Sequence, residues 1–258
     1  IAMADFQFPT EVVDLPSQGK LYPKESPLAK GTIEIRYPTA KDEDILTSVN
    51  LVRKGQVIDK FIQNLIVDKK IKYSELLIGD KNAIMIAARI LAYGKKYEVE
   101  FEHPTNGQKV SDTIDLTSFK DKIIDESLLP KNGSDIPFKL PNSKIDVTFK
   151  LLTALDEDEV TRELEGLKKI SKVDGVDRGV TTRLKRLITS VNGDSEKATI
   201  TEFVDNYLLS RDAVALREHA RMVTPDIDLS WDYMDEDGVN HTLQLPITTK
   251  FFWPESAI

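Results

Sequence analysis

The chain has 258 residues, 40% of them hydrophobic and 30% charged, and a formal net charge of −8. A chain of this length and composition folds without disulfides or metals, and its lack of cysteine excludes disulfides, iron–sulfur clusters and cysteine-based zinc sites. Net acidity argues against a general nucleic-acid coat, since phosphate neutralisation dominates such binding. No apolar run is long enough for a membrane span, and the first residues lack the basic and apolar regions of a signal peptide. We therefore expect no nucleic-acid partner and no membrane span.

The first half of the chain shows a strand pattern followed by helix patterns. Residues 33–37 alternate between apolar and polar, which predicts a strand. Thr39 follows as a helix N-cap, because the acidic residues after it suit the first turn of a helix. Apolar spacings of three and four residues predict helices over 45–52 and 57–67, and we expect a third helix to start at Asp80.

The second half shows the same order of patterns. A strand is predicted over 147–151, and Thr153 takes the position of the helix N-cap. Helices are expected over 160–170 and 180–191, and a further helix is expected to start at Asp212.

Each half then ends in a pattern typical of a β-hairpin. Two alternating runs flank a turn that contains Asn-Gly in the first half and Asp-Gly in the second, and both dipeptides favour tight hairpin turns. The first hairpin is expected within 97–116 around the turn 104–107. The second is expected within 227–245 around the turn 235–238.

Identical residues also recur in the same order in the two halves. Six residues from Thr39 return from Thr153 with five identities, and Asp80 returns later as Asp212. This order favours an internal duplication, with a period too long for a solenoid. We therefore predict an α+β fold of two similar lobes, each with a helical middle bracketed by β-hairpins. The predicted divisions are an N-terminal extension (1–11), a first lobe (12–124), a linker (125–135) and a second lobe (136–258) that includes a C-terminal aromatic segment.

Three acidic clusters could suggest chemistry. The carboxylates at 42–44 and 156–158 could serve acid–base catalysis, but in a first helical turn they more simply complement the helix dipole, and we expect that role. The turn 235–238 fails the EF-hand pattern and is expected to be a solvated hairpin tip.

No motif for catalysis or cofactor binding occurs. Phosphate-binding glycine loops, a Gly-x-Ser-x-Gly elbow and the zinc-protease pattern are all missing from the sequence. The three histidines, His103, His219 and His241, are too scattered along the chain to indicate a histidine-rich metal site. We therefore expect no catalytic residue, no cofactor and no metal, and an unrecognised hydrolase is the weakest alternative.

Basic residues gather in the second half of the chain. A solvated helix face is the simpler interpretation, and a docking surface for an acidic partner is the functional one. Nucleic acid ranks third, because no aromatic residues interleave with the basic ones. The candidate partner-binding residues here are Arg178, Arg183, Lys185 and Arg186.

The C-terminal aromatics Phe251, Phe252 and Trp253 form a second candidate partner-binding segment. Three consecutive aromatics are unusual near a chain end, and in a strand they would face two surfaces. We expect one face to close the second lobe, while the other meets the first lobe, a second copy or a partner protein. The alternative is that all three are ordinary core residues.

Five segments of the chain together carry a family resemblance: Val13–Ser17, Gly19–Pro23, Ile33–Leu46, Asp80–Arg89 and Phe251–Pro254. They resemble the baseplate hub assembly proteins of T-even-type phages, over most of the chain. The resemblance implies a non-enzymatic protein that helps to build the central hub of a contractile tail's baseplate and acts by protein–protein binding. A permanent structural subunit of the baseplate hub in the virion is the alternative.

The resemblance also sets expectations for partners and metals. It implies other phage baseplate or hub proteins as partners, with self-association as a further option, and a place in the host cytoplasm during tail assembly or in the virion baseplate. Family members often carry paired cysteines at their hairpin turns, in the manner of zinc knuckles. The corresponding turns here, 103–107 and 233–238, have none, so we expect that a metal role does not carry over.

Overall fold

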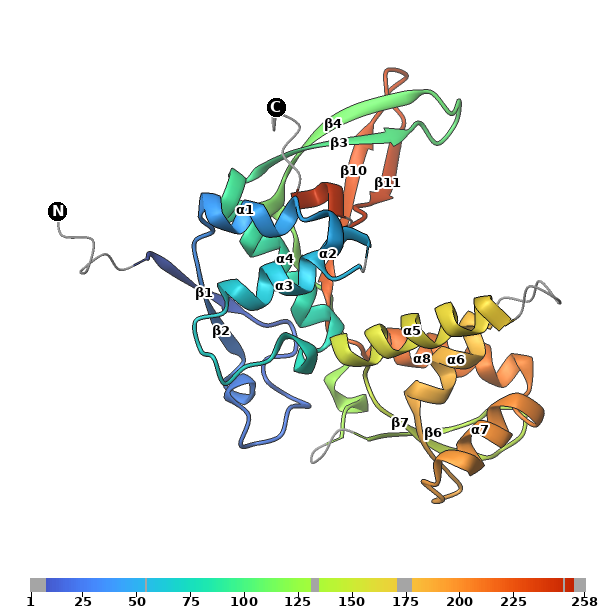
Figure 1. Cartoon of the computed structure of the whole chain (residues 1–258). Helices are drawn as coiled ribbons and strands as arrows, with labels where there is room; N and C mark the ends of the chain where they lie inside the picture. The colour runs from blue at the N-terminus through green and yellow to red at the C-terminus, as the bar shows by residue number, and fades with distance from the viewer. Residues whose placement is uncertain (1–7, 54, 131–134, 171–177, 248, 253–258) are drawn as a thin grey trace.

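A computed structural model of the chain describes residues 8–53, 55–130, 135–170, 178–247 and 249–252 (Figure 1). The helices of this part are α1 (Ala40–Leu46), α2 (Val49–Arg53), α3 (Val57–Leu65), α4 (Ile78–Tyr93), α5 (Ala154–Ile170), α6 (Gly179–Leu187), α7 (Lys197–Asn206) and α8 (Ser210–Val223). The strands are β1 (Thr10–Asp14), β2 (Thr32–Arg36), β3 (Lys96–Glu102), β4 (Lys109–Asp115), β5 (Lys120–Asp121), β6 (Ile136–Lys139), β7 (Asp146–Phe149), β8 (Ile188–Val191), β9 (Ile227–Asp228), β10 (Ser230–Met234) and β11 (Asn240–Gln244). Helices and small antiparallel sheets are mixed along the chain, which confirms the predicted α+β class.

A first hydrophobic core forms where the β1–β2 hairpin meets helices α1, α3 and α4. The strands pair in antiparallel register, and Ile33 and Ile35 of β2 are fully buried. Helix α3 contributes Phe61, Ile62 and Leu65, which are also buried. The spacing of these apolar residues follows the helical period, so one face of α3 enters the core while the other stays in water.

A second hydrophobic core lies between a three-stranded sheet and helices α6, α7 and α8. The sheet has the strand order β6–β7–β8, and Val147 and Phe149 of its central strand are buried. The helices cover them with Leu184, Phe203 and Leu216. Each lobe thus buries one face of a small sheet beneath helices, as a domain must to remove apolar surface from water.

One predicted element is wrong in type. The sequence predicts a single helix over 180–191, but α6 ends at Leu187 and the next four residues form β8. Strand β8 pairs with β7 and completes the sheet. The apolar residues fit a helical spacing, but Ile188 and Val191 are β-branched and the edge of β7 needs a hydrogen-bonding partner, so tertiary pairing decides the local structure.

The last described residues return to the first core. Strand β9 pairs with β5, and Phe251 and Phe252 lie fully buried in the first core together with Leu245. The sequence grouped 136–258 in one lobe, whereas residues packed around the second core end at Val223, and those from Ile227 onward pack against the first. The division of the chain into domains stays a prediction.

Backbone contacts join the two cores. The N–H of Ala154, at the start of α5, donates to the carbonyl of Leu76 at 2.8 Å. Gly79, in the first turn of α4, lies close to the segment that joins α8 to β9. A Cβ added at this position would sit 1.9 Å from the carbonyl oxygen of Pro225. The cores are therefore in direct contact where α4 and α5 begin.

The two halves share details of helix capping. In the first, the carboxylate of Asp42 accepts the N–H and hydroxyl of Thr39 at 2.7 and 2.9 Å. In the second, Asp156 accepts the N–H and hydroxyl of Thr153, both at 3.0 Å. Thr39 and Thr153 thus lie in like elements, at the starts of α1 and α5.

A second pair of buried carboxylates also corresponds. Asp80, in α4, accepts the N–H and hydroxyl of Ser17 at 2.9 and 2.6 Å. Asp212, in α8, accepts the N–H groups of Asn142 and Ser143 at 2.8 and 2.9 Å. In each case a helix carboxylate fixes the turn that follows a strand. Such matches are what a duplication would leave, and the duplication itself stays a prediction.

Candidate functional site

The predicted basic residues lie on or next to α6 and face carboxylates of the same lobe. Arg178 is the residue just before α6, and the other three form ion pairs with side chains from α5 and α7. The pairs are Arg183 with Glu157, Arg186 with Glu159 at 2.6 Å, and Lys185 with Asp205 at 2.7 Å. These three cations are balanced within the chain, which supports the solvated-face interpretation, while partner binding at this surface stays a prediction.

The C-terminal aromatics divide between the core and a part of the chain outside the described residues. Phe251 and Phe252 have no exposed surface. Phe252 contacts the ring of Phe61 edge-on at 5.3 Å between ring centroids, and the Phe251 carbonyl accepts the Nε–H of Arg89 at 2.9 Å. The expectation that this segment closes the second lobe is wrong for these two residues, because they complete the first core. Trp253 lies outside the described residues.

The acidic residues at the starts of α1 and α5 are occupied by capping. Burial disfavours the charged form of Asp42, but hydrogen bonds from Arg36 and Thr39 outweigh it and hold the pKa of this carboxyl well below its usual value. Asp156 has the same balance, with Lys150 as its cation, and its pKa is also lowered. Both groups are therefore ionised caps, as expected. In the same turn as Asp156, partial burial and the neighbouring carboxylate of Asp59 raise the pKa of Asp158.

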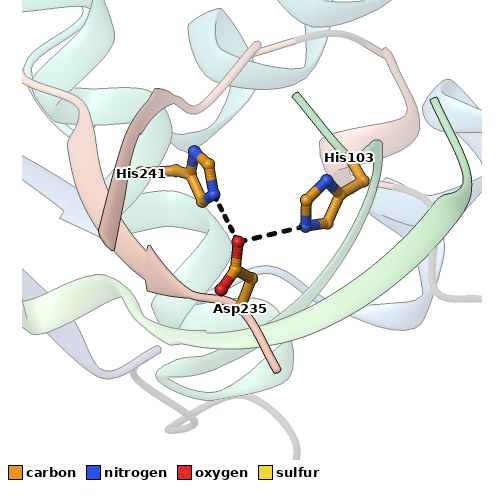
Figure 2. Close-up of side chains that lie close together, drawn as sticks. All are labelled: His103, Asp235 and His241. Atoms are coloured by element: carbon orange, nitrogen blue, oxygen red, sulfur yellow. Dashed lines mark hydrogen bonds and ion pairs between the residues drawn. The ribbon is translucent and has the colours of Figure 1, made fainter. Parts of the chain in front are cut away.

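Side chains of different hairpins converge at one point of the structure (Figure 2). His103 directly follows β3, Asp235 follows β10 and His241 lies on β11. The Nε2 atoms of His241 and His103 lie 2.7 and 3.6 Å from the Oδ2 atom of Asp235. The side chains are 15%, 10% and 7% exposed for His241, His103 and Asp235 respectively. The cluster is thus largely shielded from solvent.

The Asp235 carboxylate is held by its own turn. Its Oδ1 atom accepts the N–H groups of Asp237 and Val239 at 3.0 and 2.8 Å. The hydrogen bond with His241 and these backbone donors lower the pKa of Asp235. The expectation of a fully solvated hairpin tip is therefore wrong for this side chain, although its neighbours Glu236 and Asp237 are exposed.

Aromatic rings hold the two hairpins against each other beside this cluster. Phe101 of β3 packs edge-on against Trp231 and Tyr233 of β10, with centroid distances of 5.8 and 4.9 Å. The rings of His103 and His241 are 5.3 Å apart. Edge-to-face pairs of this kind contribute about 0.5–1.5 kcal/mol each beyond their buried area, so the hairpins form one unit.

Sequence reasoning missed this cluster because His103 and His241 are far apart in the chain. Each hairpin was correctly predicted, but nothing in a local pattern states that two hairpins pack side by side. The available signal was their shared alternation of aromatic residues, since Phe101 and Tyr233 occupy matching positions just before the two turns.

Comparison with known proteins identifies the family. Residues 8–253 match the family described as T4 bacteriophage base plate protein, which is nearly the whole chain. The chain belongs to this family. Comparison with curated proteins and with solved structures gave no match.

Family membership places the chain among bacteriophage baseplate proteins, with a structural or assembly role and other baseplate proteins as its partners. It also confirms the resemblance drawn from the sequence at the level of T4-like baseplate proteins. Within the part of the chain that the structure describes, no helix is both long and apolar enough to cross a membrane.

Proposed function

We propose that this protein is a non-enzymatic assembly protein for the baseplate hub of a contractile phage tail. It acts by binding other baseplate or hub proteins in the host cytoplasm while the tail is built. The observation that carries the proposal is the match to the T4 bacteriophage base plate family over residues 8–253, together with the motifs that resemble the hub assembly proteins.

The side-chain arrangement supports binding over chemistry. Asp42 and Asp156, one carboxylate of each acidic cluster, cap helices, and Asp80 and Asp212 fix turns. A hydrolase would need a nucleophile beside a base or a metal with an open position next to a substrate cleft.

The alternative function is that of a permanent structural subunit of the hub. The composition of purified virions separates the two roles. Quantitative mass spectrometry should find the protein absent from virions if it is an assembly factor. It should find the protein in a fixed ratio to other baseplate subunits if it is structural.

A deletion phage tests both roles together. Loss of the gene should stop assembly at a stage without complete hubs, and expression of the wild-type chain in the host should restore infectious particles. The exposed-surface variant Tyr207→Ala should also restore them, since Tyr207 is 60% exposed. Complete, infectious tails without the gene would overturn both roles.

A further inference from the structure

We propose that His103, Asp235 and His241 form a zinc site that ties the β3–β4 hairpin to the β10–β11 hairpin (Figure 2). One ligand atom from each side chain can be chosen so that all three lie within 4.8 Å of one another. The two imidazoles approach a single carboxylate oxygen from different hairpins. The inference is independent of the proposed role in hub assembly.

The donor set suits zinc. Two imidazole nitrogens and one carboxylate oxygen are ordinary zinc ligands, with bonds of about 2.0–2.2 Å and tetrahedral geometry. Such bonds place ligand atoms roughly 3.4 Å apart. The present separations of 2.7 and 3.6 Å from Asp235 Oδ2 to the two Nε2 atoms lie on either side of that value. Binding therefore needs a small widening between Asp235 and His241, and the two imidazole nitrogens, which lie within 4.8 Å of each other, must come to the same spacing. A partner's side chain would fill the fourth position and close the site, as in structural zinc sites.

The surroundings already orient the ligands. The backbone N–H groups that bind Oδ1 of Asp235 leave its Oδ2 for the imidazoles. Tyr233 packs near both rings, with centroid distances of 6.0 Å to His103 and 6.3 Å to His241. Outer partners of this kind fix the ligand orientation and strengthen metal sites.

Charge also favours a cation at this place. The turn that carries Asp235 also holds the carboxylates of Glu236 and Asp237 and no lysine or arginine. Without a metal, Asp235 hydrogen-bonds to His241 and lies 3.6 Å from His103, and this arrangement is the competing explanation of the geometry.

Zinc bound to His103 would break the hydrogen bond between this side chain and the backbone of Thr105. The N–H of Thr105 donates to Nδ1 of His103 at 3.2 Å, so the neutral ring carries its proton on Nε2. A metal on Nε2 moves that proton to Nδ1 and opens the contact with Thr105. The contact is long and lies in an exposed turn, so its loss opposes binding only weakly.

The proposal departs from the sequence-based expectation of no metal. That expectation treated each hairpin turn separately, and neither turn alone has more than one histidine. The packing of the two hairpins supplies the third ligand.

Titration of the metal-free chain with zinc chloride tests the site. Calorimetry should show one saturable zinc per chain, and zinc should raise the melting temperature. His103→Gln and His241→Gln should each weaken zinc binding by more than about tenfold, since loss of even an outer partner costs about 10–100-fold. His219→Gln is the matched control, because His219 stacks on Phe138 at 4.6 Å in the second lobe and should leave binding unchanged.

Two results would overturn the proposal. The first is the absence of one saturable zinc site in the wild-type chain. The second is an equal loss of binding in His219→Gln and in the cluster variants. If the cluster variants fail to fold by circular dichroism, X-ray absorption of the zinc-loaded wild-type chain decides the question. Two imidazoles with only nitrogen and oxygen ligands support the site, and any other coordination refutes it.

Discussion

Replacement of Phe252 by alanine tests whether the segment 249–252 completes the first core. Its side chain has no exposed surface and contacts Phe61 at 5.3 Å. Replacement of a buried Phe by Ala removes both its transfer free energy and its packing, and the cost is about 3–5 kcal/mol. The Phe252→Ala variant should therefore be markedly less stable than the wild-type chain.

The expected change in melting temperature follows from the entropy of unfolding. At about 2.1 cal/mol/K per residue, a chain of this length that unfolds as one unit has an entropy of about 0.5 kcal/mol/K. A loss of 3–5 kcal/mol then lowers the melting temperature by about 6–10 °C. If the first core unfolds separately, the smaller entropy makes the shift larger.

Differential scanning calorimetry measures this shift against a matched control. Tyr207→Ala removes an aromatic ring that is 60% exposed at the end of α7, and surface changes of this kind stay within about 0.5 kcal/mol. If Phe252→Ala melts within 1–2 °C (an interval of about 0.5–1 kcal/mol) of the control, the aromatic segment does not belong to the first core and the argument is refuted.

Three further predictions rest on single contacts. Gly79→Ala should lower the free energy of unfolding because its Cβ would meet Pro225. Gly166→Ala, in open space on α5, should raise this free energy by about 0.5–1 kcal/mol. If urea melts show that both variants are more stable than the wild-type chain, Gly79 does not lie against Pro225. Asp42→Ala should lower the free energy of unfolding by about 3 kcal/mol, because it leaves the mostly buried cation of Arg36 unpaired. Asp44 is exposed, so Asp44→Ala should stay near wild type, and equal denaturation midpoints for the two variants would be inconsistent with the cap. Hydrogen bonds lower the pKa of Asp212 to about 2, so its contribution to stability is present above about pH 4 and is lost as the pH falls from about 4 to about 2. Urea melts across this range should show a smaller loss in the free energy of unfolding for Asp212→Asn than for the wild-type chain. The same dependence of this free energy on pH in both proteins would count against the effect.

Local patterns predicted the elements that depend on local physics. Both hairpins and the helices that start near Asp80 and Asp212 appear where turn chemistry and apolar spacing placed them. The N-caps at Thr39 and Thr153 were equally readable, because a hydroxyl followed by a carboxylate three positions later satisfies free N–H groups within one turn. Helix α7 was not predicted, although its buried residues Ile200, Phe203 and Val204 lie at helical spacings.

Features that depend on distant pairing were not readable. Residues 188–191 satisfy a helical spacing equally well, and only the presence of β7 makes them a strand. The burial of Phe251 and Phe252 was foreseen as one alternative, but not the core that receives them. The His103–Asp235–His241 cluster needed the packing of two hairpins whose turns are separated by more than half the chain.

The return of the C-terminal segment to the first core has a consequence for synthesis on the ribosome. Phe251 and Phe252 are fully buried in the first core, yet they emerge from the ribosome after its other buried members, most of which come from residues 13–116. The N-terminal half therefore cannot reach its final packing before residues 251 and 252 have emerged, and it carries exposed apolar surface until then. The second core is built from residues 136–223 and Leu77, the residue before α4. All of its buried residues are therefore synthesised before Phe251 and Phe252. The second core is thus completed before the first, although most of the first core is synthesised earlier. A chain truncated before residue 251 should leave its first core incompletely packed.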